Sequence, residues 1–278
     1  MIKLENFDVM GWEHAIRGMR NPMNSWEKSD SGYGCNLYGN RIHCRNCNVV
    51  DKGSCMTYRD FEMGENDLTL MMKLANGGPV HAKYRRMITV YVDITAPLYW
   101  WKEFDTYKVG TVANSCSTMH KIHEKEFDVD DFSYEYLLDD VDDLAPDCPL
   151  LADPNDRHNA FSPANIFVLT VKMLNACRAK YLETKERIKD AKDSDEEKRL
   201  KELAKIHWWQ MIQLLPTSYN QKRTVMLNYE VLAGIYPMRK NHKLDEWVEF
   251  CAWIEKLPYS EIITGKQSEE GTGNGSVE

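Results

Sequence analysis

The sequence has little of what a membrane or secreted protein needs. None of its 278 residues belongs to an apolar run of about 18 or more, the length that spans a bilayer as a helix. The first residues, MIKLENFDVMGWEH, lack the basic and apolar segments of a secretory signal. A general nucleic-acid or membrane-surface binder needs a basic footprint, but 35 Lys and Arg face 43 Asp and Glu, for a net charge of −8. We therefore expect a cytoplasmic globular protein that is not a general binder of nucleic acid or of membrane surfaces.

Hydrophobic periodicity predicts an α+β chain, with a small central β-sheet and a helix-rich C-terminal half. The segment RMITVYVDIT (86–95) alternates strictly, with Ile88, Val90, Val92 and Ile94 on one side, which is typical of a strand. Helices are predicted over 64–78, from Thr95 onward, over 162–186, from a cap at Ser194 to about 215, over 221–236 and over 241–257. No internal repeat is present. We read 1–264 as a single domain with a Cys-rich insertion at about 30–60, and 265–278 as a disordered tail.

A polar stretch follows the aromatic segment APLYWWKEF. It reads DTYKVGTVANSCSTMHK (105–121) and contains small polar residues, one cysteine, two lysines and a histidine. Helical segments usually return to apolar periodicity within a turn or two, and this stretch does not. Such a pattern indicates a loop or a helix start that faces a ligand.

This stretch, with the strand and Ala-Pro before it, resembles the signature region of the flavin-dependent thymidylate synthases. That family carries R-H-R-x-x-S-x-x-E-x-S-x-R-Y after the helix that Ala-Pro introduces. An ungapped overlay places the signature residues, in order, on Thr106, Tyr107, Lys108, Thr111, Asn114, Cys116, Thr118 and Met119. The spacing is kept, but uncharged residues replace the charged ones, except that Lys108 stands in place of the second arginine.

A second stretch, LLPTSYNQKRTVMLNYEVLAGIYPMRKNHKLDEW (214–247), resembles the late part of the same family. There an Asn contacts flavin and an Arg eleven residues later grips the nucleotide, and Asn228 and Arg239 fall on these positions. His242 lies one residue out of register with a family histidine. His81 falls near the place of a histidine that stacks close to flavin.

The resemblance implies a family-like fold and an enzyme that reductively methylates, or otherwise modifies at C5, a deoxyuridine-type nucleotide. It implies FAD as cofactor, with NADPH and methylenetetrahydrofolate as co-substrates, and a homotetramer with sites at subunit interfaces. The implied nucleotide-binding residues are Arg239, Lys108, Asn114 and Cys116. The implied flavin-binding residues are Asn228, Thr106, Tyr107, Thr111 and His81.

The altered signature leaves alternatives open. Arginine forks bind phosphate with charge and geometry, whereas a lysine supplies a point charge alone. Phosphate affinity would then come from elsewhere, and the candidates are Arg239, Lys240, Lys222, Arg223 and the basic HAKYRR (81–86), which also reads as a solvated strand entry. Cys116 is either a nucleophilic thiol or a small residue in place of serine. The chain is either such an enzyme or a nucleotide-binding or regulatory protein that keeps the fold without flavin chemistry.

Four of the eight cysteines lie close together in CNLYGNRIHCRNCNVVDKGSC (35–55). Cys44 and Cys47 have the Cys-x-x-Cys spacing of a tetrahedral zinc site, and Cys35 and Cys55 could complete four thiolates, with His43 as a further ligand. The alternative is a loop of reduced cysteines. Four thiolates leave no open position, so any zinc here is expected to be structural, and a zinc-stabilised interaction protein is a third functional hypothesis.

Overall fold

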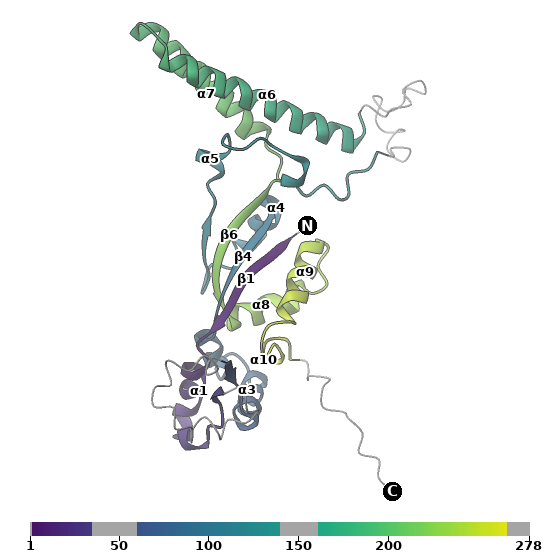
Figure 1. Ribbon diagram of the computed structural model, residues 1–278. Coiled ribbons are helices and arrows are strands. Elements are labelled where there is room, and N and C mark those ends of the chain that lie inside the picture. The colour runs from purple at the N-terminus through teal and green to yellow at the C-terminus, as the bar shows by residue number, and fades with distance from the viewer. Residues whose placement is uncertain (1, 35–59, 140–160, 266–278) are drawn as a thin grey trace. The chain divides into compact units, whose positions relative to one another are not determined.

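The computed structural model describes residues 2–34, 60–139 and 161–265 (Figure 1). The chain combines helices with a four-stranded antiparallel sheet, so the α+β class expected from the sequence is confirmed. The strand order in this sheet is β1 (Lys3–Met10), β4 (Thr89–Pro97), β6 (Asn220–Asn228) and β5 (Val112–Ser115). Figure 1 shows β1, β4 and β6 running side by side. Among the described helices, none is both long and apolar enough to cross a membrane.

Strand β4 confirms the alternation read from the sequence. Ile88, just before it, and Val90, Val92 and Ile94 within it are all at most 1% exposed. The strand continues through Pro97, however, so the prediction of a helix beginning at Thr95 is wrong. The helix α4 begins at Leu98 and ends at Phe104. The first N–H groups of a helix have no partner within it, and here those of Leu98 and Tyr99 donate to the backbone carbonyls of residues 219 and 217.

The prediction of a helix over 221–236 is wrong in its first half. Residues 220–228 form β6, and the helix α8 (Tyr229–Arg239) begins only after Asn228. Buried residues at Val225, Tyr229 and Leu232 have helical spacing across this boundary, which explains the error. The next predicted helix exists but is shorter, as α9 (Asp245–Ile254).

The chain divides into two compact units. Unit 1 comprises Met1–Lys3, Thr95–Thr106 and Ser115–Arg223; unit 2 comprises Leu4–Ile94, Tyr107–Asn114 and Thr224–Glu278. The division cuts through the strands, so that β4 gives residues 89–94 to unit 2 and 95–97 to unit 1. The expectation of a single domain over 1–264 stays a prediction, and the proposed tail lies outside the described residues except for Gly265.

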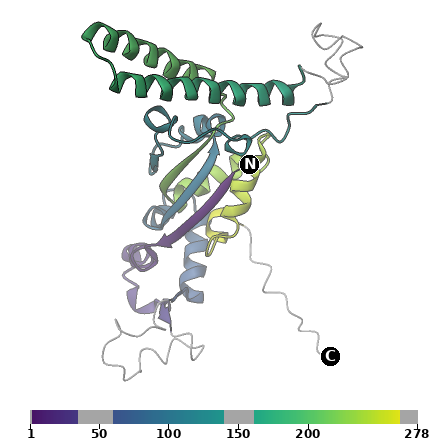
Figure 2. The ribbon, with the colours of Figure 1, turned by 45° about the horizontal axis from the view of Figure 1, so that its top comes forward.

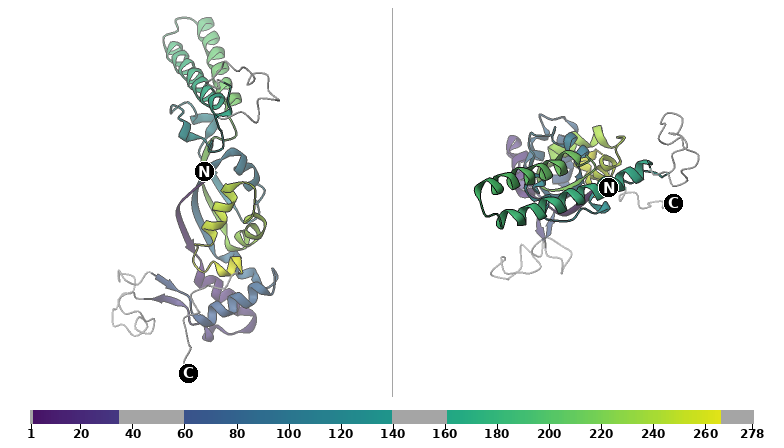
Figure 3. Two further views of the ribbon diagram at one scale, coloured as in Figure 1. Left: turned by 90° about the vertical axis from the view of Figure 1, so that its right-hand side faces the viewer. Right: turned by 90° about the horizontal axis from the view of Figure 1, so that it is seen from above.

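Unit 1 contains α4, α5 (Thr118–Lys121), the short helix η4 (Val129–Asp131), α6 (Pro163–Lys189) and α7 (Ser194–Leu214). Helices α6 and α7 lie side by side as a long hairpin in every view (Figures 1 and 3). Ser162 caps α6 by accepting a hydrogen bond from the Asn165 N–H at 3.1 Å, at the residue where the sequence predicts the helix to begin. The cap of α7 is Asp193, which accepts from Glu196 N at 2.7 Å, and not Ser194. A buried cluster fills this unit: Ile122, Phe127, Phe132, Phe167, Val171, Leu174, Cys177 and Met211.

Unit 2 contains the other described helices and the strands β2 and β3. They are α1 (Trp12–Arg20), η1 (Asn21–Met23), η2 (Trp26–Lys28), β2 (Gly32–Gly34), β3 (Asp60–Glu62), α3 (Glu65–Asn76), η3 (Ala82–Met87), α8, α9 and α10 (Glu261–Thr264). Strands β2 and β3 pair antiparallel, with Gly32 opposite Glu62 (Figure 3). Helices α8 and α9 follow one another at the C-terminal end of the described chain (Figure 2). Both helices contribute to the core, and Leu232, Ile235, Trp247 and Phe250 each have no exposed surface.

Candidate functional site

The two stretches that resemble the flavin-dependent enzymes meet within unit 2. Arg239, in the last turn of α8, donates from Nε to the hydroxyl of Tyr107 at 2.9 Å. Gly110 lies against Asn228, since a Cβ built on Gly110 would be 2.9 Å from Asn228 Nδ2. The 107–111 loop is thus placed beside both residues that the second stretch nominates. Sequence positions more than 100 residues apart are brought into contact here.

Arg239 is held among aromatic rings. Its guanidinium carbon lies 4.6 Å from the centroid of the Trp247 ring and 5.7 Å from that of Tyr107. Both distances fall within the range of a cation–π interaction, and Trp is the strongest partner. The side chain is half-buried. These contacts orient a planar cation that is able to bind an oxyanion with two parallel hydrogen bonds.

His242 adds a competing acceptor beside Arg239. Its Nε2 is 2.8 Å from Arg239 Nη1, and its Nδ1 is 3.1 Å from the Leu244 N–H. A neutral imidazole accepts through one nitrogen and donates through the other, so it satisfies one of these two donors at a time. The choice of tautomer therefore decides whether Arg239 Nη1 is engaged by His242.

Asn228 is the cap of α8. Its Oδ1 accepts from Glu230 N and Val231 N, both at 3.1 Å, which satisfies two of the N–H groups left open at the start of the helix. This role fixes the amide so that its nitrogen points toward Gly110, which adopts a left-handed φ of +81°. Asn228, to which the resemblance assigns a flavin contact, thus has a structural role of its own.

The other predicted residues of unit 2 differ in exposure. Lys108 and Asn114 are exposed, the latter on β5. Thr111 is half-buried, and its Oγ1 is a buried polar atom without a hydrogen-bond partner among the described residues. His81 is exposed and precedes η3, with its ring beside Gly77.

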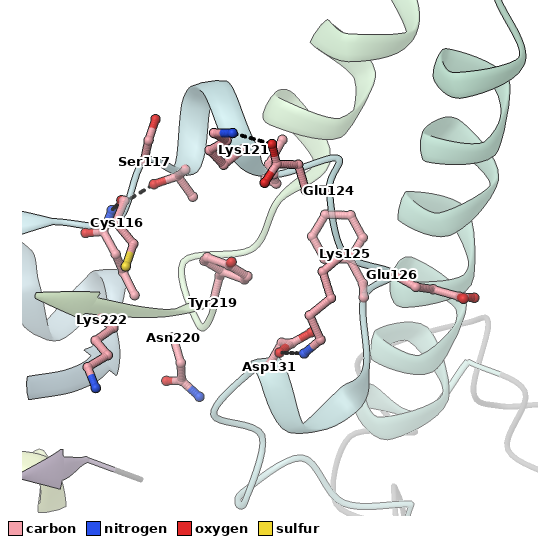
Figure 4. Close-up of a pocket in the computed structure, with 14 residues that line it drawn as sticks. Cys116, Ser117, Lys121, Glu124, Lys125, Glu126, Asp131, Tyr219, Asn220 and Lys222 are labelled. Atoms are coloured by element: carbon pink, nitrogen blue, oxygen red, sulfur yellow. Dashed lines mark hydrogen bonds and ion pairs between the residues drawn. The ribbon is translucent and has the colours of Figure 1, made fainter. Parts of the chain in front are cut away.

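Thr106 and Cys116 belong to unit 1. Thr106 is exposed and donates its hydroxyl hydrogen to the carbonyl of Glu103 at 2.7 Å, closing the end of α4. Cys116 is exposed and free. It lines a cavity of about 510 Å³ together with Tyr219, Lys222 and two further lysines, as Figure 4 shows.

The charges around this cavity are balanced. Lys121 pairs with Glu124, and Lys125 Nζ lies 2.6 Å from Asp131 Oδ1. The hydrogen bond that Lys125 donates to Asp131 raises the pKa of Lys125, so this lysine stays cationic. Burial raises the pKa of Tyr219, so the ring remains a neutral phenol. The cavity therefore combines an aromatic ring and a thiol with paired charges, a lining suited to a polar ring rather than to a bare anion.

The predicted zinc ligands Cys35, Cys44, Cys47 and Cys55 lie outside the described residues, so the zinc site stays a prediction. Within the part of the chain that is described, no group of three or more His, Cys, Asp or Glu is placed to hold a metal ion.

Sequence reasoning missed Trp247, Gly110 and Gln221. Trp247 carries the stacking surface for Arg239, but a tryptophan within an amphipathic helix signals only core packing. The positive φ of Gly110 has a weak signal, since glycine in a polar loop often supplies that conformation. The interactions of Gln221 within the 221–223 segment of β6 were hidden by its prediction as helix.

Comparisons with known proteins bear on the fold. No protein-family model and no curated protein matches the sequence. Among solved structures, thymidylate synthase X (ThyX) from Helicobacter pylori with FAD and dUMP matches with a TM-score of 0.51 and 16% identity, over 95% of this chain and 97% of that one. A second structure of the flavin-dependent enzyme from the same organism, also complexed with FAD and dUMP, gives 0.51 and 15% identity, over 95% and 96%.

This chain has the fold of flavin-dependent thymidylate synthase. A UMP/dUMP methylase, PolB from Streptomyces cacaoi bound with 5-Br dUMP, is also similar, with a TM-score of 0.47 and 11% identity, over 95% of each chain. At 15–16% identity the ThyX structures support the fold alone.

Proposed function

We propose that this protein is a nucleotide-modifying enzyme of the flavin-dependent thymidylate synthase type. It would bind FAD and a deoxyuridine-type nucleotide and modify the base at C5, by reductive methylation with methylenetetrahydrofolate as one-carbon donor and NADPH as reductant. The observation that carries the proposal is the contact of Tyr107 with Arg239 at 2.9 Å, because it joins the altered signature to the residue expected to bind phosphate. The ThyX structures that share this fold are described with FAD and dUMP.

The residues of unit 2 fit a flavin nucleotide at three points. The buried hydroxyl of Thr111 has no partner among the described residues and offers a donor. Lys108 offers an exposed ammonium for a pyrophosphate. Gly110, with no side chain, allows close approach to the amide of Asn228. A bound flavin would supply the hydride chemistry that none of these side chains can perform.

In this proposal the chain's own residues bind and orient. Arg239 would bind the nucleotide phosphate, and Tyr107 and Trp247 fix the plane of its guanidinium beforehand. Such preorganisation lowers the entropy lost when the ligand binds. Asn114 and Cys116 remain proposed base contacts, and Thr106 and His81 proposed flavin contacts. Asn114 offers an amide where the family has a carboxylate, so proton transfer by that position is not part of the proposal.

Self-association is also proposed, as a homotetramer. Helix α6 carries an apolar stripe, with Ile166 49%, Leu169 54% and Met173 55% exposed. These residues are spaced three and four apart, so they share one helix face. A contiguous apolar face of this kind usually marks an interaction surface.

One observation favours the alternative of a nucleotide-binding or regulatory protein without flavin chemistry. The first signature position, Thr106, has its hydroxyl engaged by the Glu103 carbonyl, and it carries no charge. Loss of the signature's guanidinium groups weakens a flavin site more than it weakens a site built on Arg239.

The test is a visible absorbance spectrum of the purified protein, before and after FAD is added and excess removed, followed by titration with dUMP. Retained flavin and bound dUMP would support the enzyme, and turnover with the folate donor and NADPH would be assayed next. We expect Arg239→Ala to raise the Kd for dUMP about tenfold or more, since charge-assisted hydrogen bonds contribute about 1.5–3 kcal/mol. The exposed Arg199→Ala on α7 is the matched control and should leave this Kd unchanged. Binding of dUMP without flavin would favour the alternative, and binding of neither would reject both.

A further inference from the structure

Arg223 of β6 is held by three partners within unit 1. Its guanidinium carbon lies 4.1 Å from the centroid of the Trp101 ring. Its Nη1 lies 2.7 Å from Asp105 Oδ1, and its side chain is only 14% exposed. Its Nε donates to Gln221 Oε1 at 2.9 Å. A guanidinium that is stacked and paired in this way is oriented as a plane, which the point charge of a lysine does not reproduce.

Gln221 connects the oriented guanidinium of Arg223 to the 116–118 segment. Arginine has only donors, so the oxygen of the Gln221 amide has to face Arg223 and its nitrogen has to face away. On that side Nε2 donates to the Cys116 carbonyl at 3.1 Å and to Thr118 Oγ1 at 2.7 Å. Gln221 is 8% exposed, so water offers these groups little substitute. Without Arg223 the Gln221 amide would lose the partner that holds its oxygen, and only the hydrogen bonds donated by Nε2 would keep its orientation.

Two consecutive residues of β6, Gln221 and Lys222, therefore hold the 116–118 segment by hydrogen bonds. The Cys116 N–H donates to the Lys222 carbonyl at 3.0 Å, and the Gln221 side chain holds the Cys116 carbonyl. The Gln221 backbone is fixed in turn, because its carbonyl accepts from Trp101 Nε1 at 2.9 Å. These hydrogen bonds fix one wall of the cavity that Cys116 and Lys222 line (Figure 4).

We propose that Arg223 is a positioning residue of the nucleotide site, which acts through Gln221 to fix the 116–118 segment. The inference rests on the proposed function, in which Cys116 belongs to that site. Asp105, which pairs with Arg223, directly precedes Thr106, the first signature position. Arg223 is thus an arginine beside the altered signature whose guanidinium orients protein groups. A buried polar network is seldom more stable than apolar packing, so its geometry is what it contributes.

The experiment compares Arg223→Met, Arg223→Lys and Gln221→Glu with the wild type. Gln221→Glu keeps the shape and the pairing with Arg223 but removes both donors to the 116–118 segment. Arg199→Met is the control, because Arg199 is exposed on α7 in the same unit. One readout is the rate at which N-ethylmaleimide labels Cys116, followed by mass spectrometry on its own peptide so that other cysteines do not contribute. The other is the Kd for dUMP by calorimetry.

We expect all three variants to change the labelling rate of Cys116 by about threefold or more and to raise the Kd for dUMP by about tenfold, the effect of losing one well-placed interaction. Wild-type values in Arg223→Lys would mean that charge alone suffices and would overturn the positioning role. Wild-type values in Gln221→Glu would overturn the relay. A lowered Tm with both readouts unchanged would show that the network only stabilises the fold, and would also overturn it.

Two further outcomes are separable. If the Arg223 variants do not fold, Gln221→Glu, which retains the Arg223 pairing, decides alone. If the wild-type protein binds no dUMP, the proposed function is refuted. The labelling rates then still decide whether Arg223 fixes the 116–118 segment.

Discussion

Replacing Gly110 by alanine would test the packing of the 107–111 loop against the start of α8. Gly110 has a φ of +81°, and a Cβ there would lie 2.9 Å from Asn228 Nδ2 and 3.1 Å from Val231 Cγ2. The left-handed backbone costs a residue with a Cβ about 1–2 kcal/mol. Displacement of Asn228 would also remove the cap of α8, which contributes about 0.5–2 kcal/mol. We therefore expect Gly110→Ala to lower the free energy of unfolding by about 1.5–4 kcal/mol, the sum of the two effects.

Gly78→Ala separates the two contributions. Gly78 also has a positive φ, +93°, but no atom lies within 4 Å of a Cβ built on it. Gly78→Ala should therefore lower the free energy of unfolding only by the cost of the left-handed backbone, about 1–2 kcal/mol. Urea unfolding gives both losses, and hydrogen exchange over 229–239 reports the first turn of α8 directly. Equal losses in the two variants, or unchanged exchange in Gly110→Ala, would show that the loop does not pack on Asn228.

Two further predictions concern unit 2 and the surface of α6. Asp67 is fully buried, pairs with Arg20 Nε at 2.6 Å and accepts further hydrogen bonds, so Asp67→Asn should cost about 3–5 kcal/mol in urea unfolding, whereas exposed Asp8→Asn should cost less than about 0.5 kcal/mol. Burial alone would raise the pKa of Asp67, but hydrogen bonds and the charge of Arg20 hold it below its usual 3.8. The folded pKa is thus the lower one, so the wild-type advantage is complete above about pH 5 and disappears as the pH falls below about 4, and a pH-independent difference would contradict this. Leu169→Glu, at a position 54% exposed on α6, should shift the protein to a smaller species in light scattering, while the neighbouring exposed Lys172→Glu should not; equal masses would refute an interface on this face.

Local physics made several elements of this fold predictable. The alternation over 86–95 places every second side chain on one face, and that face is buried in β4. The hydroxyl of Ser162 satisfies an open N–H at the start of α6, so the beginning of this helix could be predicted from the residue type and the proline after it. These features depend on neighbours within a few residues, which a sequence displays directly.

Tertiary structure decided the character of 220–228. Val225, Tyr229, Leu232 and Tyr236 are buried at helical spacing, so periodicity alone favours one continuous helix. The backbone instead pairs between β4 and β5, and these partners lie more than 100 residues away in sequence. Helix and strand each satisfy the same N–H and C=O groups, so the choice depends on whether neighbouring strands are present.

The candidate site divides in the same way. The sequence by itself determined which segments carry it, because Asn228 and Arg239 keep their spacing and the 105–121 stretch stays polar where a buried element would be apolar. Only the tertiary structure decided how their side chains are used. It placed Tyr107 against Arg239, and it turned Arg223, one of several candidates for binding phosphate, toward Trp101 and Gln221. Hydrogen bonds and ring contacts act over a few ångströms, so their partners become known only when distant parts of the chain have been brought together.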